Sequence, residues 1–253
     1  MPGRRKVWLG VGLAGIIVIA IVFGWQRSSE ARLLRAAPDS IPADPGLYSF
    51  AVSRGATVFG AHCASCHGDR ERGDTRQGVP DLRDQDWLYG TGKVSDIERV
   101  VAYGIRAHDP RGWNLAIMPA LGTPVPGGEK GLKPLSPGDI DDVTDFLMMV
   151  EHRPFEQAAA QRGRAIYLGR GACYDCHGSD ARGDSSIGAP NLADNIWIYG
   201  DGRRATIFQS IAKGRKGICP AWIRTLSPTA IREVALYVYW LSNSKGRAAA
   251  RVP

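Results

Sequence analysis

The longest apolar run of the chain lies near its N-terminus. Residues 7–25, VWLGVGLAGIIVIAIVFGW, hold no charge over 19 positions, and a helix of that length spans a bilayer core. Arg4, Arg5 and Lys6 precede the run, so the positive-inside rule places the N-terminus in the cytoplasm. A cleaved signal peptide is the competing interpretation, but its apolar core would be shorter and no small-x-small cleavage site follows. The pattern therefore predicts a single uncleaved transmembrane anchor over residues 1–25.

After the anchor, apolar positions recur at helical spacing in short stretches that loops rich in glycine and proline separate. LSPGDIDDVTDFLMMV and LSPTAIREVALYVYWLS each begin with a serine cap and a proline in the first turn. The second has an inward apolar stripe, made by Ile231, Val234, Ala235 and Val238. Shorter helices are expected around SRGATVFGAHC and QRGRAIYLGRGAC, from Ser95, and from about Arg204. These patterns predict an all-α fold.

The sequence also repeats itself. Cys63 and Cys173 are 110 residues apart, and VPDLRDQDWLYG and APNLADNIWIYG keep the same offset. Extra residues then enter the first copy, and the two copies meet again at their LSP segments. Self-similarity at a fixed offset indicates two copies of one structural unit.

The repeat predicts how the chain is divided. The anchor covers residues 1–25 and is followed by a linker with three prolines at 26–50. The first domain covers 51–150, an interdomain linker 151–160, the second domain 161–242 and a flexible tail 243–253. Below, the first repeat means residues 51–150 and the second repeat means residues 161–242.

Charge narrows the classes of partner. The chain carries a formal net charge of +7, and residues 202–253 hold ten Lys/Arg against the single acid Glu233. Such a basic end docks acidic proteins or anionic lipid, or is simply a solvated surface. Basic residues do not alternate with aromatic ones in any run, so we expect no binding of nucleic acid.

Four of the five cysteines form the motifs CASCH and CYDCH, which end at His67 and His177. Paired cysteines also occur in disulfide frameworks and zinc sites. Here a histidine directly follows the second cysteine both times, which suits covalent attachment of haem. Two thiols add across the two vinyl groups, and the adjacent histidine is placed to ligate the iron. The sequence therefore predicts two covalently attached haem c groups, held by Cys63 and Cys66 and by Cys173 and Cys176.

The order of motifs resembles that of class I cytochrome c domains, with C-x-x-C-H, a Met-Pro loop and a terminal helix. PDLRDQDWLYG, AYGIRAHDPR, AIMPALG, GAPNLADNIWIYG and GRKGICPAW together resemble the diheme cytochrome c subunit of cbb3-type oxidases, over about residues 50–242. The resemblance implies one N-terminal transmembrane helix followed by two tandem class I cytochrome c domains. It implies a non-catalytic electron relay of a respiratory complex in the bacterial inner membrane, with periplasmic haem domains. Its partners would be the other subunits and a redox protein such as another cytochrome c.

The axial ligands are predicted from the two copies of the ligand loop. AIMPALG places Met118 as the distal ligand opposite His67. The second repeat has Cys219 at the aligned position and contains no methionine, and its only histidine is His177. Cys219 is therefore the candidate ligand there, while Lys213, Lys216, an open position or an inert thiol remain alternatives.

Four aromatic residues are candidates for the walls of the haem pockets, or equally for ordinary packing with one satisfied polar end: Trp87, Tyr89, Trp197 and Tyr199. Arg106 and Arg215 are candidate partners of the haem propionates. By contrast, Met148 and Met149 are expected in the core, and the remaining histidines, His62, His108 and His152, are expected on the surface.

Two departures from the resemblance keep other functions open. The apolar span already begins at residue 7, and Cys219 replaces a methionine. The alternatives are an electron-transfer subunit of a different membrane dehydrogenase or oxidase, and a His/Cys-haem enzyme of the thiosulfate-oxidising type. A redox sensor that uses the labile thiolate is a third.

Overall fold

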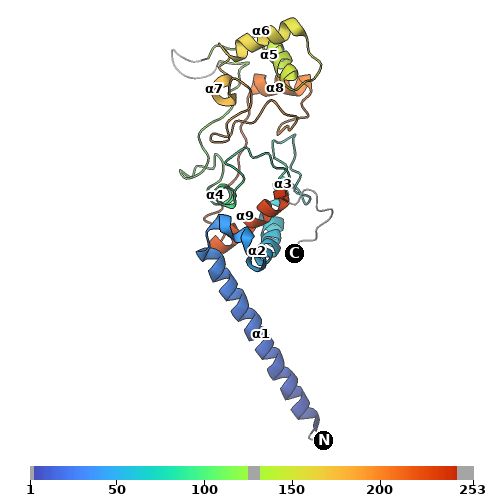
Figure 1. Ribbon diagram of the computed structural model, residues 1–253, viewed down its shortest axis with the longest axis vertical. Coiled ribbons are helices and arrows are strands. Elements are labelled where there is room, and N and C mark those ends of the chain that lie inside the picture. The colour runs from blue at the N-terminus through green and yellow to red at the C-terminus, as the bar shows by residue number, and fades with distance from the viewer. Residues whose placement is uncertain (1–2, 125–131, 244–253) are drawn as a thin grey trace.

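The computed structural model describes residues 3–124 and 132–243, with side chains from residue 16 onward. The predicted tail beyond residue 243 and part of GTPVPGGEKGLKP, the stretch rich in glycine and proline at 122–134, lie outside the described residues. Two helical bodies are stacked along the long axis, and one long helix projects from the lower body (Figure 1). Every described element is a helix, as the sequence predicted.

The elements follow one another in the order of the repeat. The long helix α1 (Gly3–Arg35) and the 3-10 helix η1 (Pro38–Ala43) come first. The first repeat contributes α2 (Pro45–His62), α3 (Ala64–His67), α4 (Val94–Tyr103) and α5 (Pro137–Val150). The second contributes α6 (Gln157–Tyr167), α7 (Tyr174–His177), α8 (Arg204–Lys213) and α9 (Pro228–Asn243).

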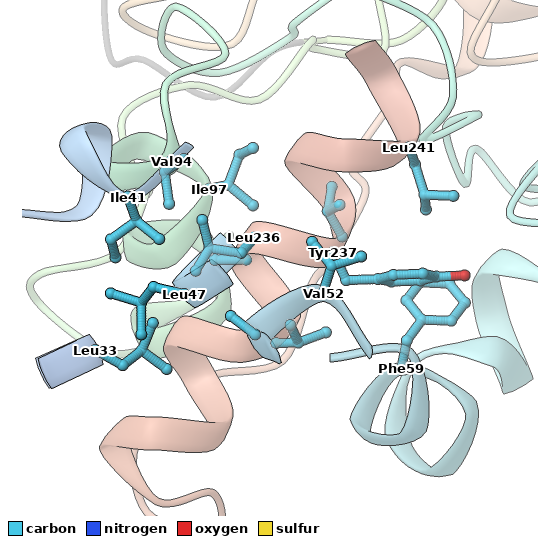
Figure 2. Close-up of a cluster of buried hydrophobic side chains, with 14 residues drawn as sticks. Leu33, Ile41, Leu47, Val52, Phe59, Val94, Ile97, Leu236, Tyr237 and Leu241 are labelled. Carbon is cyan, nitrogen blue, oxygen red and sulfur yellow. The ribbon is translucent and has the colours of Figure 1, made fainter. Parts of the chain in front are cut away.

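The first body contains α2, α3, α4 and α9. Helix α9 lies against α2 and α4, and the stripe predicted for it is buried between them. Figure 2 shows the apolar core that these helices share. Its labelled members are Leu33, Ile41, Leu47, Val52, Phe59, Val94, Ile97, Leu236, Tyr237 and Leu241.

The second body contains α5, α6, α7 and α8. Helix α5 lies against α6 and α8, and Ile140, Val143 and Phe146 point into a second apolar core with Ile166 and Ile207. Ser136 caps α5 in a capping box with Asp139, and Ser227 Oγ accepts from Ala230 N (3.2 Å) at the start of α9. Both serine caps that the LSP segments predicted are thus confirmed.

The two repeats exchange their terminal helices. Helix α5 ends the first repeat but packs in the second body, and α9 ends the second repeat but packs in the first. Between them the chain crosses twice, and the two crossing segments pair through isolated bridges, Ile105 with Cys219 and Met118 with Arg215. Each body therefore needs both repeats to complete its core.

The transmembrane helix predicted for residues 7–25 is not borne out. In the part of the chain that the structure describes, no helix is both long and apolar enough to cross a membrane. The apolar segment of α1 with described side chains, residues 16–25, is followed by Arg27 and Glu30.

Residues 26–50, which we predicted to be a linker, form the end of α1, η1 and the start of α2. Leu33, Ile41 and Leu47 from this segment are buried in the first core. Arg232 of α9 fixes the end of α1, because its Nη1 donates to the carbonyls of Leu33 (2.9 Å) and Ala36 (3.1 Å). Of the three prolines that suggested a tether, Pro38 and Pro45 instead begin η1 and α2, where they fit the first turn, and Pro42 lies inside η1.

The exchange of helices predicts a specific pattern of energetic coupling. In the second body, Arg162 of α6 holds Asp142 of α5 in a bidentate ion pair (2.8 and 2.7 Å). The equivalent pair in the first body joins Arg54 of α2 to Glu233 of α9. A double-mutant cycle of Asp142→Ala and Arg162→Ala, measured by denaturant unfolding, should give about 0.5–1 kcal/mol of coupling. The control cycle of Asp142→Ala with Arg54→Ala should give a coupling near zero; coupling of Asp142 to Arg54 instead would mean that each repeat keeps its own helix.

Candidate haem sites

Both C-x-x-C-H motifs form a short helix directly after a longer one. Helix α2 leads into α3, and α6 leads into α7, so that the first cysteine caps each short helix. The four motif cysteines are unpaired thiols. His67 Nδ1 lies 3.3 Å from the carbonyl oxygen of Pro80, and His177 Nδ1 lies 3.0 Å from that of Pro190. A proton on Nδ1 satisfies this carbonyl and leaves Nε2 with its lone pair.

The electrostatics of the two histidines match a metal ligand. Burial lowers the pKa of His67 and of His177, and the hydrogen bonds to Pro80 and Pro190 oppose that effect only in part. Both rings are therefore neutral near pH 7. Neutral imidazole, oriented by a hydrogen bond from its other nitrogen, is the form that binds iron.

A largely apolar cavity of about 340 Å³ lies beside His177. Leu192, Ile207 and Ile211 line it, together with Cys173 and Cys176. Thiols, a neutral histidine and apolar walls fit the covalent attachment, ligation and burial of a haem. The residues present thus match the group that the motif predicted.

Met118 lines this same cavity with His177. Its backbone is held by the second repeat, since Met118 N donates to Arg215 O (3.2 Å) and Arg215 N donates to Met118 O (3.0 Å). The pairing of Met118 with His67 that the sequence suggested therefore differs from the observed arrangement. The reason is the crossing of the chain, which carries the ligand loop of the first repeat into the second body.

Cys219 belongs to the second repeat but lies near the C-x-x-C-H motif of the first repeat. Its carbonyl oxygen accepts from Ile105 N (2.9 Å), and its thiol is close enough to Cys63 and Cys66 to interact with them electrostatically. Burial raises the pKa of the Cys219 thiol to about 11, with a further contribution from those two thiols. The side chain is thus a neutral thiol at pH 7, and binding a metal as thiolate would release its proton.

The cavity beside His177, called the second cavity from here on, has a polar end where the two repeats meet. Arg106 Nη1 donates to Tyr89 Oη (2.8 Å), and Arg106 Nε donates to the carbonyl oxygen of Gly217. Arg215 lies over the ring of Tyr199, 4.5 Å from its centroid. All four side chains line the cavity. Two guanidinium groups therefore stand at one end of an apolar cavity, which suits the carboxylates of a haem.

The structure separates the predicted aromatic residues into two groups. Tyr89, Tyr199 and Trp197 line the second cavity, whereas Trp87 packs against the core of the first body. Met148 and Met149 pack against the second core, as expected, and the three histidines expected on the surface, His62, His108 and His152, are exposed. Sequence reasoning missed Glu151, which is buried beside Trp197; its only signal was its position directly after the apolar LMMV.

Comparisons with known proteins agree with this description. A family model described as "Cytochrome c" matches residues 52–151, and one described as "Cytochrome C oxidase, cbb3-type, subunit III" matches residues 158–238. The chain is 36% identical over 219 residues to the cbb3-type cytochrome c oxidase subunit FixP of Bradyrhizobium sp. (85% of this chain, 69% of the relative). It is 37% identical over 228 residues to subunit CcoP of Rhodobacter capsulatus (87% and 72%). A FixP of Sinorhizobium medicae is 35% identical, and the chain spans 66% of its length.

Proposed function

The chain belongs to the FixP/CcoP family of cbb3-type cytochrome c oxidase subunits, and on that premise we propose that it is a diheme electron relay of a respiratory oxidase. The supporting observation is the presence of two C-x-x-C-H helices, each with a neutral histidine, half-buried at His67 and buried at His177, whose Nδ1 faces a backbone carbonyl. When bound, each haem supplies one-electron redox chemistry. The protein binds the haems, excludes water from them and sets their potentials.

We assign the ligands across the exchange of helices. Cys173, Cys176 and His177 would hold the second haem, with Met118 as its distal ligand. Cys63, Cys66 and His67 would hold the first, with Cys219 as the candidate distal ligand. Methionine ligation raises the potential of a haem, whereas a thiolate donates electron density. The second haem should therefore be the more oxidising of the two.

The partners follow from the family. We infer that the chain associates with the oxygen-reducing subunits of a cbb3-type oxidase at the periplasmic face of the bacterial inner membrane. It would accept electrons from a redox protein such as another cytochrome c. The loops that follow the two C-x-x-C-H motifs are hydrogen-bonded to each other, since Gly90 N donates to Ser185 O (3.0 Å) and Gly200 N to Thr75 O (2.9 Å).

The proposal predicts two haems per chain and a specific companion. A haem assay on the purified protein should give two, and replacing Cys63 and Cys66 with serine should leave one. Purification of the tagged chain from membranes should bring down an oxygen-reducing haem–copper core. Recovery of a dehydrogenase core, or turnover of thiosulfate by the purified chain, would instead support one of the alternative functions.

A further inference from the structure

Glu151 is a buried carboxylate that the ligand set does not use. It caps the C-terminus of α5, and its side chain is only 1% exposed. Arg153 Nε lies 2.9 Å from Oε2, but neither carboxylate oxygen accepts a hydrogen bond of good geometry. A buried carboxylate without hydrogen bonds is costly in its charged form. The position therefore favours uptake of a proton.

The surroundings of Glu151 connect it to the second haem site. The indole of Trp197 lies beside the carboxylate and also lines the second cavity. Among the described residues its buried Nε1 makes no hydrogen bond of good geometry, but its N–H is near enough to the carboxylate to favour the charged form slightly. Gly202 packs closely against both of these neighbours of Glu151, because a Cβ on Gly202 would lie 2.4 Å from Trp197 Nε1 and 2.8 Å from Arg153 Nη2. One side chain thus separates the carboxylate from the haem cavity.

The charges around Glu151 oppose one another. Burial raises the pKa of Glu151 to about 7, Asp194 adds to this shift, and Arg153 and the indole N–H of Trp197 oppose it. Asp194 in turn faces Asp86 of the first repeat. The carboxyl group is therefore close to half-protonated at neutral pH, where a change of one charge nearby has its largest effect on proton binding.

The first haem site differs at this position. Ser242 of α9 is the counterpart of Glu151 in the repeat, since both lie 14 residues after the first proline of their helix. Ser242 is fully buried and satisfied, because its Oγ donates to Tyr239 O (3.0 Å). A hydroxyl does not titrate near pH 7, so this pair of positions makes the two sites chemically different.

We propose that Glu151 takes up a proton from solvent when the second haem is reduced, and releases it when that haem is oxidised. This inference rests on the proposed function, from which the electron donor and acceptor come. The electron arrives from the redox donor, an O–H bond of a hydronium ion in the solvent breaks to leave water, and an O–H bond forms on the Glu151 carboxylate. Reduction removes one positive charge from the site, so the proton affinity of the carboxylate is higher in the reduced state. The second haem would thus transfer electrons together with protons, and the first would not.

Redox titration of the complete haem-loaded protein between about pH 5 and about pH 9, a range that brackets neutral pH, tests the proposal. The midpoint potential of the second haem should fall with rising pH around neutrality. The limiting slope is a tenfold change in the reduction equilibrium constant per pH unit, about 59 mV for one electron. Glu151→Gln should abolish the slope and keep the potential at the acid plateau of the wild type, because glutamine mimics the neutral acid. Ser242→Ala, the matched control, should keep the slope.

Two results would overturn the proposal: a wild-type potential that does not change with pH, or a Glu151→Gln protein that keeps the full slope. If Glu151→Gln fails to bind the second haem, the wild type provides the answer by infrared difference spectroscopy. Reduction should then produce a carboxylic acid band at the expense of a carboxylate band, and its absence would refute proton uptake by Glu151. A haem assay distinguishes a failure of this inference from a failure of the proposed function. Fewer than two haems per wild-type chain would contradict the proposed function, whereas two haems without proton uptake would contradict only the role of Glu151.

Discussion

Replacing Met118 with leucine is expected to lower the midpoint potential of the second haem by about 100 mV or more, roughly a fiftyfold change in its reduction equilibrium constant. Leucine keeps the apolar contact but removes the sulfur that ligates iron. The first haem should keep its potential, because Met118 lies in the cavity with His177 and not beside His67.

Two single-haem proteins make this experiment decisive. The double substitution Cys63→Ser and Cys66→Ser retains only the second haem, and Cys173→Ser with Cys176→Ser retains only the first. Met118→Leu should change the potential and the EPR spectrum of the former and leave those of the latter unaltered. Met148→Leu, in the second core, is the matched control and should alter neither. A Met118→Leu effect confined to the haem at Cys63 and Cys66 would mean that each repeat supplies its own ligand.

The local parts of this fold could be predicted from the sequence because their signals are local. The serine caps of α5 and α9, the buried stripe of α9 and the start of α8 each depend on residues within one or two helical turns. The C-x-x-C-H motifs likewise carry their own chemistry. The carbonyls that orient the two histidines come from Pro80 and Pro190, both thirteen residues after their histidine.

The exchange of α5 and α9 could not be predicted in this way. The two helices are copies of one another, so either could cover α2 or α6 with a similar apolar face. Which of them does so depends on the path of the chain through the pairs Ile105–Cys219 and Met118–Arg215, and a linear pattern contains no signal for that path. The same argument explains why the ligand pairing was assigned within each repeat.

The largest effect on stability is expected at the glycines where exchanged helices cross. A Cβ at Gly163 of α6 would lie 1.9 Å from the carbonyl oxygen of Asp142 in α5, and one at Gly55 of α2 would lie 2.1 Å from that of Glu233 in α9. Both obstacles are backbone atoms, which cannot rotate away as a side chain would. Gly163→Val should therefore force α5 and α6 apart and cost about 3 kcal/mol or more in free energy of unfolding.

A glycine that also lies within a helix, but has no close neighbours, supplies the control. Gly60 of α2 has no atom within 4 Å of its Cβ position, so Gly60→Ala should stabilise the protein by about 0.5–1 kcal/mol through helix propensity alone. Denaturant unfolding followed by circular dichroism measures both changes, and the absorbance of each single-haem protein shows which site is lost. Because α5 and α6 both belong to the second body, Gly163→Val should disturb the second haem and spare the first. Equal disturbance of both haems, or a cost no larger than that of an exposed helix substitution, would contradict the close crossing of these two helices.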